Sequence, residues 1–154
     1  MIDKVDLLPN YYVLHDSEWQ MLMLGKNAFG DYLVVSFLQE NEEFGQLNYF
    51  HVLANEAILL AFLKGDVAYL DVMKKADAIF LVRKSYNYTI LNVEKIVFAD
   101  LSKDMLPLKS SFFPKTIPSV FLDLEKRISL HKTAIERPKK RLATEHSQQI
   151  PVFH

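Results

Sequence analysis

The sequence contains no cysteine in its 154 residues, which removes several kinds of chemistry at once. Without thiols there is no disulfide framework, no thiolate metal site and no cysteine nucleophile, and nothing indicates an oxidising compartment. Glycine is also scarce, at four residues, and no GxSxG elbow, Walker loop or GxGxxG motif occurs. Nucleotide hydrolysis through a glycine-rich loop is therefore not expected, and the sequence assigns no reaction.

Long apolar runs are missing as well. The longest stretch, from Ala57 to Leu63, is far shorter than the roughly 20 residues that a membrane-spanning helix needs. The opening MIDKVDLLPN carries acidic side chains and lacks the basic and continuously apolar regions of a secretory signal. We therefore predict a cytoplasmic protein with no membrane span.

The charge is small in total but uneven along the chain. The formal net charge is −1, which is not typical of a protein dominated by phosphate contacts. Residues 1–110 contain 10 Lys and Arg against 15 Asp and Glu, whereas residues 111–154 contain 8 against 4. An acidic body thus precedes a basic tail, a pattern that suits docking on nucleic acid, on an acidic partner or on the body itself.

The hydrophobic content of 50% is enough for a substantial core in one domain of ordinary size. Alternating and β-branched runs predict strands, and apolar residues three to four positions apart predict helices capped by Asn55 and Asp66. The expected strands are 11–14, 19–24, 32–38, 46–52, 78–82 and 89–98. This pattern predicts an α+β fold in which a mostly antiparallel sheet of about five to six strands is packed by two short helices.

Prolines and charge divide the chain into three parts. We predict an α+β domain at 1–110, a proline-containing connector at 111–118, and a C-terminal part at 119–154. The last part is expected to contain an amphipathic helix from the N-cap Ser119 to about His131, followed by an extended basic tail.

The order of these pieces has a familiar form. The segments LGKNAFGDYLVV, NEAILLAFLKGDVAYLDVMKKADAIFLVRKSY and the stretch from Val93 to Pro107 resemble a family of small bacterial α+β domains of unknown function. The resemblance covers about residues 11–110 and depends on structural features, such as Gly30 before an aromatic strand and Gly65 after an apolar helix. It implies a bacterial or phage-related setting and brings no activity with it.

Two groups of apolar residues are predicted to contact another protein chain. Aromatic side chains in predicted turns are expected at the surface, and a second group forms one face of the C-terminal helix. The turn residues are Phe29, Phe44, Tyr86 and Tyr88, and the helix residues are Phe121, Leu124 and Ile128. The leading hypothesis is therefore a non-catalytic protein-interaction module, either an accessory subunit or a self-associating homo-oligomer.

Two other functions stay open at this point. In the first, a nucleic-acid accessory, the basic tail binds phosphates through Arg137, Lys139, Lys140 and Arg141. In the second, an enzyme of unrecognised type, His51 works with a nearby acid such as Glu56 or Asp66.

No cofactor or metal site is predicted. The five histidines form no HExxH motif or pair four residues apart. The carboxylates Glu40, Glu42 and Glu43 do not match an EF-hand loop, so a solvated turn is expected there.

Overall fold

The computed structural model describes residues 2–15, 22–106 and 122–129. Contacts between residues divide the chain into two units, Met1–Ile117 and Pro118–His154. In the second unit residues 122–129 are helical. The described residues do not include Ser119 and His131, where the predicted helix was expected to begin and end. They also do not include the predicted connector or the basic tail.

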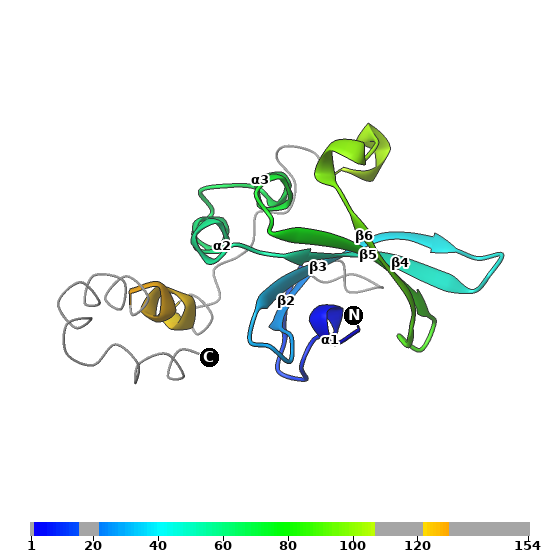
Figure 1. Ribbon diagram of the computed structural model, residues 1–154, viewed down its shortest axis with the longest axis horizontal. Coiled ribbons are helices and arrows are strands. Elements are labelled where there is room, and N and C mark those ends of the chain that lie inside the picture. Colours follow the sequence, from blue (N-terminus) through cyan, green and yellow to red (C-terminus); the bar gives the residue numbers. More distant parts are fainter. Residues whose placement is uncertain (1, 16–21, 107–121, 130–154) are drawn as a thin grey trace, which may run out of the picture. The chain divides into compact units, whose positions relative to one another are not determined.

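The first unit is built on one sheet of six strands in the order β1-β2-β3-β4-β5-β6 (Figure 1). Every neighbouring pair is antiparallel, so the predicted α+β fold with a mostly antiparallel sheet is confirmed. The strands are β1 (Tyr12–His15), β2 (Leu22–Lys26), β3 (Tyr32–Asn41), β4 (Gln46–Leu53), β5 (Ala78–Ser85) and β6 (Ile90–Ile96).

Several strand ends differ from the sequence prediction. Strand β3 runs beyond the expected Leu38 to Asn41, because its polar end keeps pairing with β4 after a bulge between Phe37 and Gln39. Strand β5 likewise continues to Ser85 through residues that read as a turn. Backbone pairing with a neighbouring strand thus extends both strands past their apolar cores.

Three short helices and two 3-10 turns complete the unit: α1 (Ile2–Val5), α2 (Glu56–Leu63), α3 (Tyr69–Lys74), η1 (Phe98–Asp100) and η2 (Lys103–Met105). The predicted N-cap of α2 is confirmed, since Asn55 Oδ1 accepts from the N–H groups of Ala57 and Ile58 at 2.9 and 3.3 Å. The predicted N-cap Asp66 is wrong. Helix α3 begins later, and the Ala68 N–H donates to Asp71 Oδ2 at 3.1 Å.

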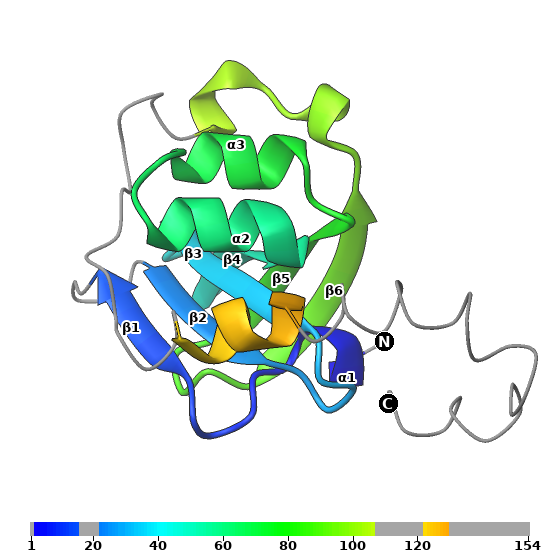
Figure 2. The same cartoon turned by 90° about the vertical axis from the view of Figure 1, so that its left-hand side faces the viewer.

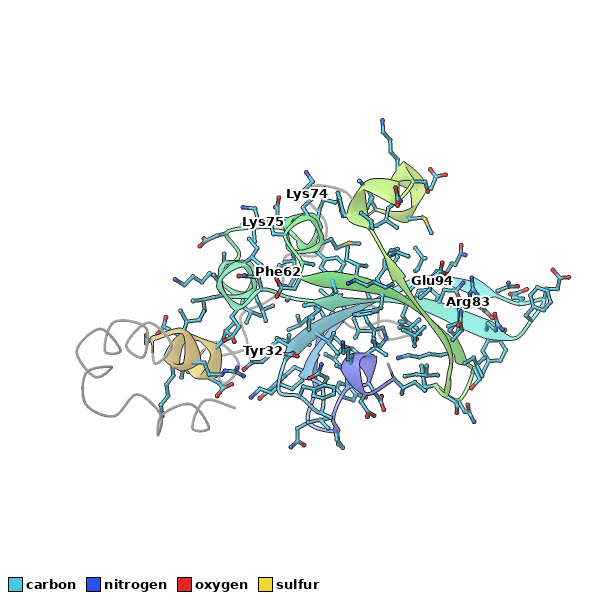
Figure 3. All side chains as sticks on the ribbon, in the orientation of Figure 1. Tyr32, Phe62, Lys74, Lys75, Arg83 and Glu94 are labelled. Atoms are coloured by element: carbon cyan, nitrogen blue, oxygen red, sulfur yellow. The ribbon has the colours of Figure 1, made fainter. Side chains whose placement is uncertain are left out.

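Helices α2 and α3 lie side by side across one face of the sheet (Figure 2). Phe62 of α2 and Tyr69 of α3 are fully or almost fully buried there, at 0% and 1% exposure, and Figure 3 marks Phe62. The hydroxyls of Tyr69 and Ser36 of β3 share a hydrogen bond of 2.7 Å. This face therefore holds an apolar core, with one satisfied polar pair in it.

The short helix α1 covers the opposite face of the sheet (Figure 1). Its residue Val5 is fully buried against Phe80 and Val82 of β5. The segment after it approaches β2 closely: a Cβ atom on Gly25 would lie 2.9 Å from Tyr11 Cβ and 3.1 Å from Leu7 Cδ2. Glycine is required at position 25 because the N-terminal segment lies against the backbone.

Within the described residues, no helix is long and apolar enough to cross a membrane.

Candidate functional site

Three exposed aromatic side chains gather at one end of the sheet, where the β3–β4 and β5–β6 turns lie next to each other. Phe44 is 67% exposed, Tyr86 46% and Tyr88 45%. Strands β4 and β5 pair up to Gln46 and Ser85, which brings the two turns together. We call Phe44, Tyr86 and Tyr88 the aromatic end. Large exposed rings grouped in this way are typical of contact surfaces.

Tyr86 connects the two turns of the aromatic end. Its hydroxyl donates to Glu40 Oε2 at 2.7 Å, although the two residues are 46 positions apart in sequence. The ring also lies beside the β3–β4 turn, since a Cβ atom on Gly45 would be 3.7 Å from Tyr86 Cε2. The hydrogen bond to Glu40 raises the pKa of Tyr86, and the negative charge of Glu42 adds to this. The two turns thus form one connected surface.

The other predicted contact residues lie elsewhere. Phe29 is 62% exposed, but the β2–β3 turn that carries it is at the opposite end of the antiparallel sheet. In the second unit Leu124 is fully buried and Ile128 is partly buried, while Phe121 lies outside the described residues. Only three of the predicted contact residues are therefore brought together in the first unit.

His51 of β4 occupies a very different position, buried on the face of the sheet that α1 covers. Its Nδ1 lies 2.6 Å from the Val5 carbonyl oxygen. Because a carbonyl only accepts, Nδ1 carries the hydrogen, and in the neutral ring Nε2 is then an unprotonated acceptor. Nε2 is buried and has no hydrogen-bond partner among the described residues. Burial, and next the positive charge of Lys84, lower the pKa of His51 to about 3.

Lys84 of β5 lies near His51 on the same face, and its burial was not anticipated from the sequence. Its Nζ lies 4.6 Å from the ring centroid of Tyr49, a cation–π arrangement. Burial lowers the pKa of Lys84 to about 8, and the nearby negative charge of Asp6 acts against this shift. Burial also raises the pKa of Tyr49, with a smaller contribution from Tyr88.

This buried group does not have the arrangement expected of an acid–base pair. His51 hydrogen-bonds a backbone carbonyl, and the carboxylates proposed as its partners, Glu56 and Asp66, belong to the α2 region that covers the other face of the sheet. The geometry therefore gives His51 a structural task, which is to hold α1 on the sheet.

A hollow of about 330 Å³ lies at the N-terminal end of α2 and is lined by Asn55, Ala57, Ile58 and Lys75. The amide groups of Ala57 and Ile58 that face this end already donate to Asn55. The hollow therefore presents Lys75 as its one charged lining residue.

The acidic residues of the β3–β4 turn, for which a solvated turn was expected, form no metal site with other described residues. Glu40, Glu42 and Glu43 are exposed at the β3–β4 turn, and no group of three His, Cys, Asp or Glu residues within 2–15, 22–106 and 122–129 has metal-binding geometry. The basic residues Arg137, Lys139, Lys140 and Arg141 lie outside the described residues.

No family model, curated protein or solved structure matches this chain. The resemblance to small bacterial α+β domains, and the setting that it implies, therefore stay predictions.

Proposed function

We propose that this chain is a non-catalytic protein-interaction module that docks on another protein chain through the aromatic end. The proposal depends on one observation: two adjacent hairpin turns place Phe44, Tyr86 and Tyr88 at the surface of the same end of the sheet. Tyrosine and phenylalanine are enriched in protein interfaces because a rigid ring buries a large area at a low cost in side-chain entropy.

The aromatic end is also built to keep its form. The Tyr86–Glu40 hydrogen bond spans 46 positions of sequence, and of the strands that lead to the two turns β3, β4 and β5 are each paired on both sides. A preorganised surface loses little conformational entropy when a partner binds. The partner is either a larger protein, which makes this chain an accessory subunit, or a second copy of the chain.

The test places a photoreactive benzoylphenylalanine at position 44 of the full chain and, as a matched control, at position 29. Both positions are exposed turn phenylalanines, at 67% and 62%, but they lie at opposite ends of the sheet. Irradiation in the cells that naturally produce the protein should give a covalent adduct from position 44 and none from position 29. Equal adducts from both positions, or none from position 44, would contradict the proposal.

A second measurement separates the two kinds of partner. If the partner is a second copy, light scattering after size-exclusion chromatography will give a mass above that of the monomer. Phe44→Ser should then lower this mass, whereas Phe29→Ser should leave it unchanged. A monomeric chain with a position-44 adduct of larger mass indicates an accessory subunit.

A further inference from the structure

Three tight hairpin turns in the described part of the sheet share one backbone feature, and Tyr88 is the exception in sequence. In each turn the N–H of the fourth residue donates to the carbonyl of the first: Gly30 to Asn27, Gly45 to Glu42, and Tyr88 to Ser85, at 3.1, 3.3 and 2.9 Å. The fourth residue has a positive φ every time, at 82°, 63° and 65°. This position suits glycine, and two of the three turns have it.

Tyr88 is the single non-glycine residue with a positive φ in the described part of the chain. A bulky side chain in this conformation costs on the order of 1 kcal/mol relative to glycine. Tyr88 is nevertheless 45% exposed, so much of its ring contributes nothing to the core. A strained aromatic residue that is kept at the surface points to a task outside the fold.

The charges around the aromatic end determine which kind of partner can bind there. Residues 40–46 and 85–91, which comprise the two turns and the adjoining strand ends, contain three glutamates and no lysine or arginine. The nearest cations along β5 are Arg83, which lies on the strand near Glu94 of β6 (Figure 3), and the partly buried Lys84. The rings define the surface, and the carboxylates make it negative.

We infer that the aromatic end binds a peptide segment rich in arginine and lysine from its partner protein. This inference rests on the function proposed above and names its partner chemistry. Guanidinium and ammonium groups are attracted to the faces of Phe44, Tyr86 and Tyr88, and carboxylates at positions 42 and 43 pair with the same cations. Nucleic acid is disfavoured at this surface because the glutamates repel phosphate.

The test is fluorescence anisotropy on the full chain with a short labelled peptide in which arginine and lysine alternate with glycine. A matched peptide has glutamine in place of every arginine and lysine. We expect the cationic peptide to bind at least about tenfold more tightly than the glutamine peptide, and its affinity to fall as salt is added. Single-stranded DNA of similar length serves as a third probe and should not bind at the aromatic end.

Matched variants locate the binding on the molecule. The affinity for the cationic peptide should fall by about fivefold or more in the double variant Glu42→Gln/Glu43→Gln. The single variant Phe44→Ser should lower it by a similar factor. At the opposite end, Asp31→Asn and Phe29→Ser should change the affinity by less than about twofold, since these exposed residues lie away from the proposed surface. Thermal unfolding of each variant confirms that it is folded.

Each contrary result has a distinct meaning. If the glutamine peptide binds as tightly as the cationic peptide, and Phe44→Ser weakens the binding of both, the inference of a cationic partner is wrong. The proposed function is not affected by this result. Binding of neither peptide together with a position-44 photo-adduct has the same consequence. DNA binding that depends on Phe44, or equal effects of Phe44→Ser and Phe29→Ser, also overturns the inference. The proposed function itself fails only if position 44 gives no photo-adduct or if position 29 gives an equal one.

Discussion

The aromatic end and the face beneath α1 use similar residues in opposite ways, although strands β4 and β5 lead to both. On the α1 face, Tyr49 and His51 are almost completely buried, at 0% and 1% exposure. Tyr49 lies under the Lys84 ammonium group, and His51 hydrogen-bonds the Val5 carbonyl. At the aromatic end, Tyr86 and Tyr88 stand nearly half exposed. The same strands thus stabilise the fold on one face and present a surface at one end. Substitutions on the α1 face should therefore change the free energy of unfolding, and substitutions at the aromatic end should mainly change partner binding.

The largest expected effect comes from His51, through the pH dependence of stability. Its folded pKa of about 3 lies below the ordinary value of 6.5, so as the pH falls the unfolded chain takes up the proton first. The stability is therefore complete above pH 6.5 and is lost progressively toward pH 3, by about 1.4 kcal/mol per pH unit from this group. Urea unfolding at pH 7 and pH 5 should show a loss of about 2 kcal/mol.

The variant His51→Leu tests whether the imidazole of His51 causes this pH dependence of stability. It should be less stable than the original chain at pH 7 by about 1–3 kcal/mol, because the Val5 carbonyl loses its donor. Between pH 7 and pH 5, however, its stability should fall less steeply, since the titrating imidazole is gone. The same slope in both proteins would show that His51 is not held neutral, and the contrast between the two regions would weaken.

Gly25→Ala should give the next largest effect, again on stability alone. The added methyl group would meet Tyr11 Cβ at 2.9 Å and Leu7 Cδ2 at 3.1 Å, so the N-terminal segment must move. Overpacking of this kind costs about 1–3 kcal/mol. Urea unfolding measures the cost, and an unchanged midpoint would mean that residues 7–11 shift without loss. Crosslinking from position 44 should be unaffected.

The two tyrosines of the aromatic end should differ by about 1 kcal/mol when each is replaced by glycine. They are equally exposed, at 46% and 45%, but only Tyr88 has a positive φ, which glycine adopts without strain. Tyr88→Gly should therefore destabilise the chain less than Tyr86→Gly does, which denaturant titration measures. Equal losses would remove the case for strain at Tyr88.

The smallest stability effect is expected for Phe44→Ser. The ring is 67% exposed, so the free energy of unfolding should change by no more than about 0.5 kcal/mol. Phe29→Ser, at 62% exposure, should behave alike in denaturant. The two variants should differ only in partner binding. A large loss of stability for Phe44→Ser alone would mean that the Phe44 ring belongs to the core.

Much of the fold was predictable because its signals are local. The period of apolar residues located α2, and the short polar side chain of Asn55 predicted its N-cap. The start of α3 was misplaced because Asp66 and Asp71 both suit a helix start, and only tertiary packing selects the residue at which the helix begins. Helix α1 was missed because its four residues have too short a pattern to read.

The candidate surface was predictable only in part. Turn position indicated that Phe29, Phe44, Tyr86 and Tyr88 reach the surface, but it did not indicate which of them meet. The hydrogen bond from Tyr86 to Glu40 spans 46 positions, and the burial of Lys84 beside Tyr49 depends on strand register. Neither is visible from neighbours in the sequence.

By itself, the sequence determined an antiparallel α+β domain without cysteine chemistry, because hydrophobic period and turn residues act over a few positions of the chain. Only the tertiary structure decided that two turns distant in sequence lie together with three exposed rings and a negative charge, and that His51 is buried against α1 and Lys84 lies over Tyr49 on the same face. The physical reason is strand register: pairing β4 with β5 fixes which side chains are buried on a face and which are left together at the end of the sheet.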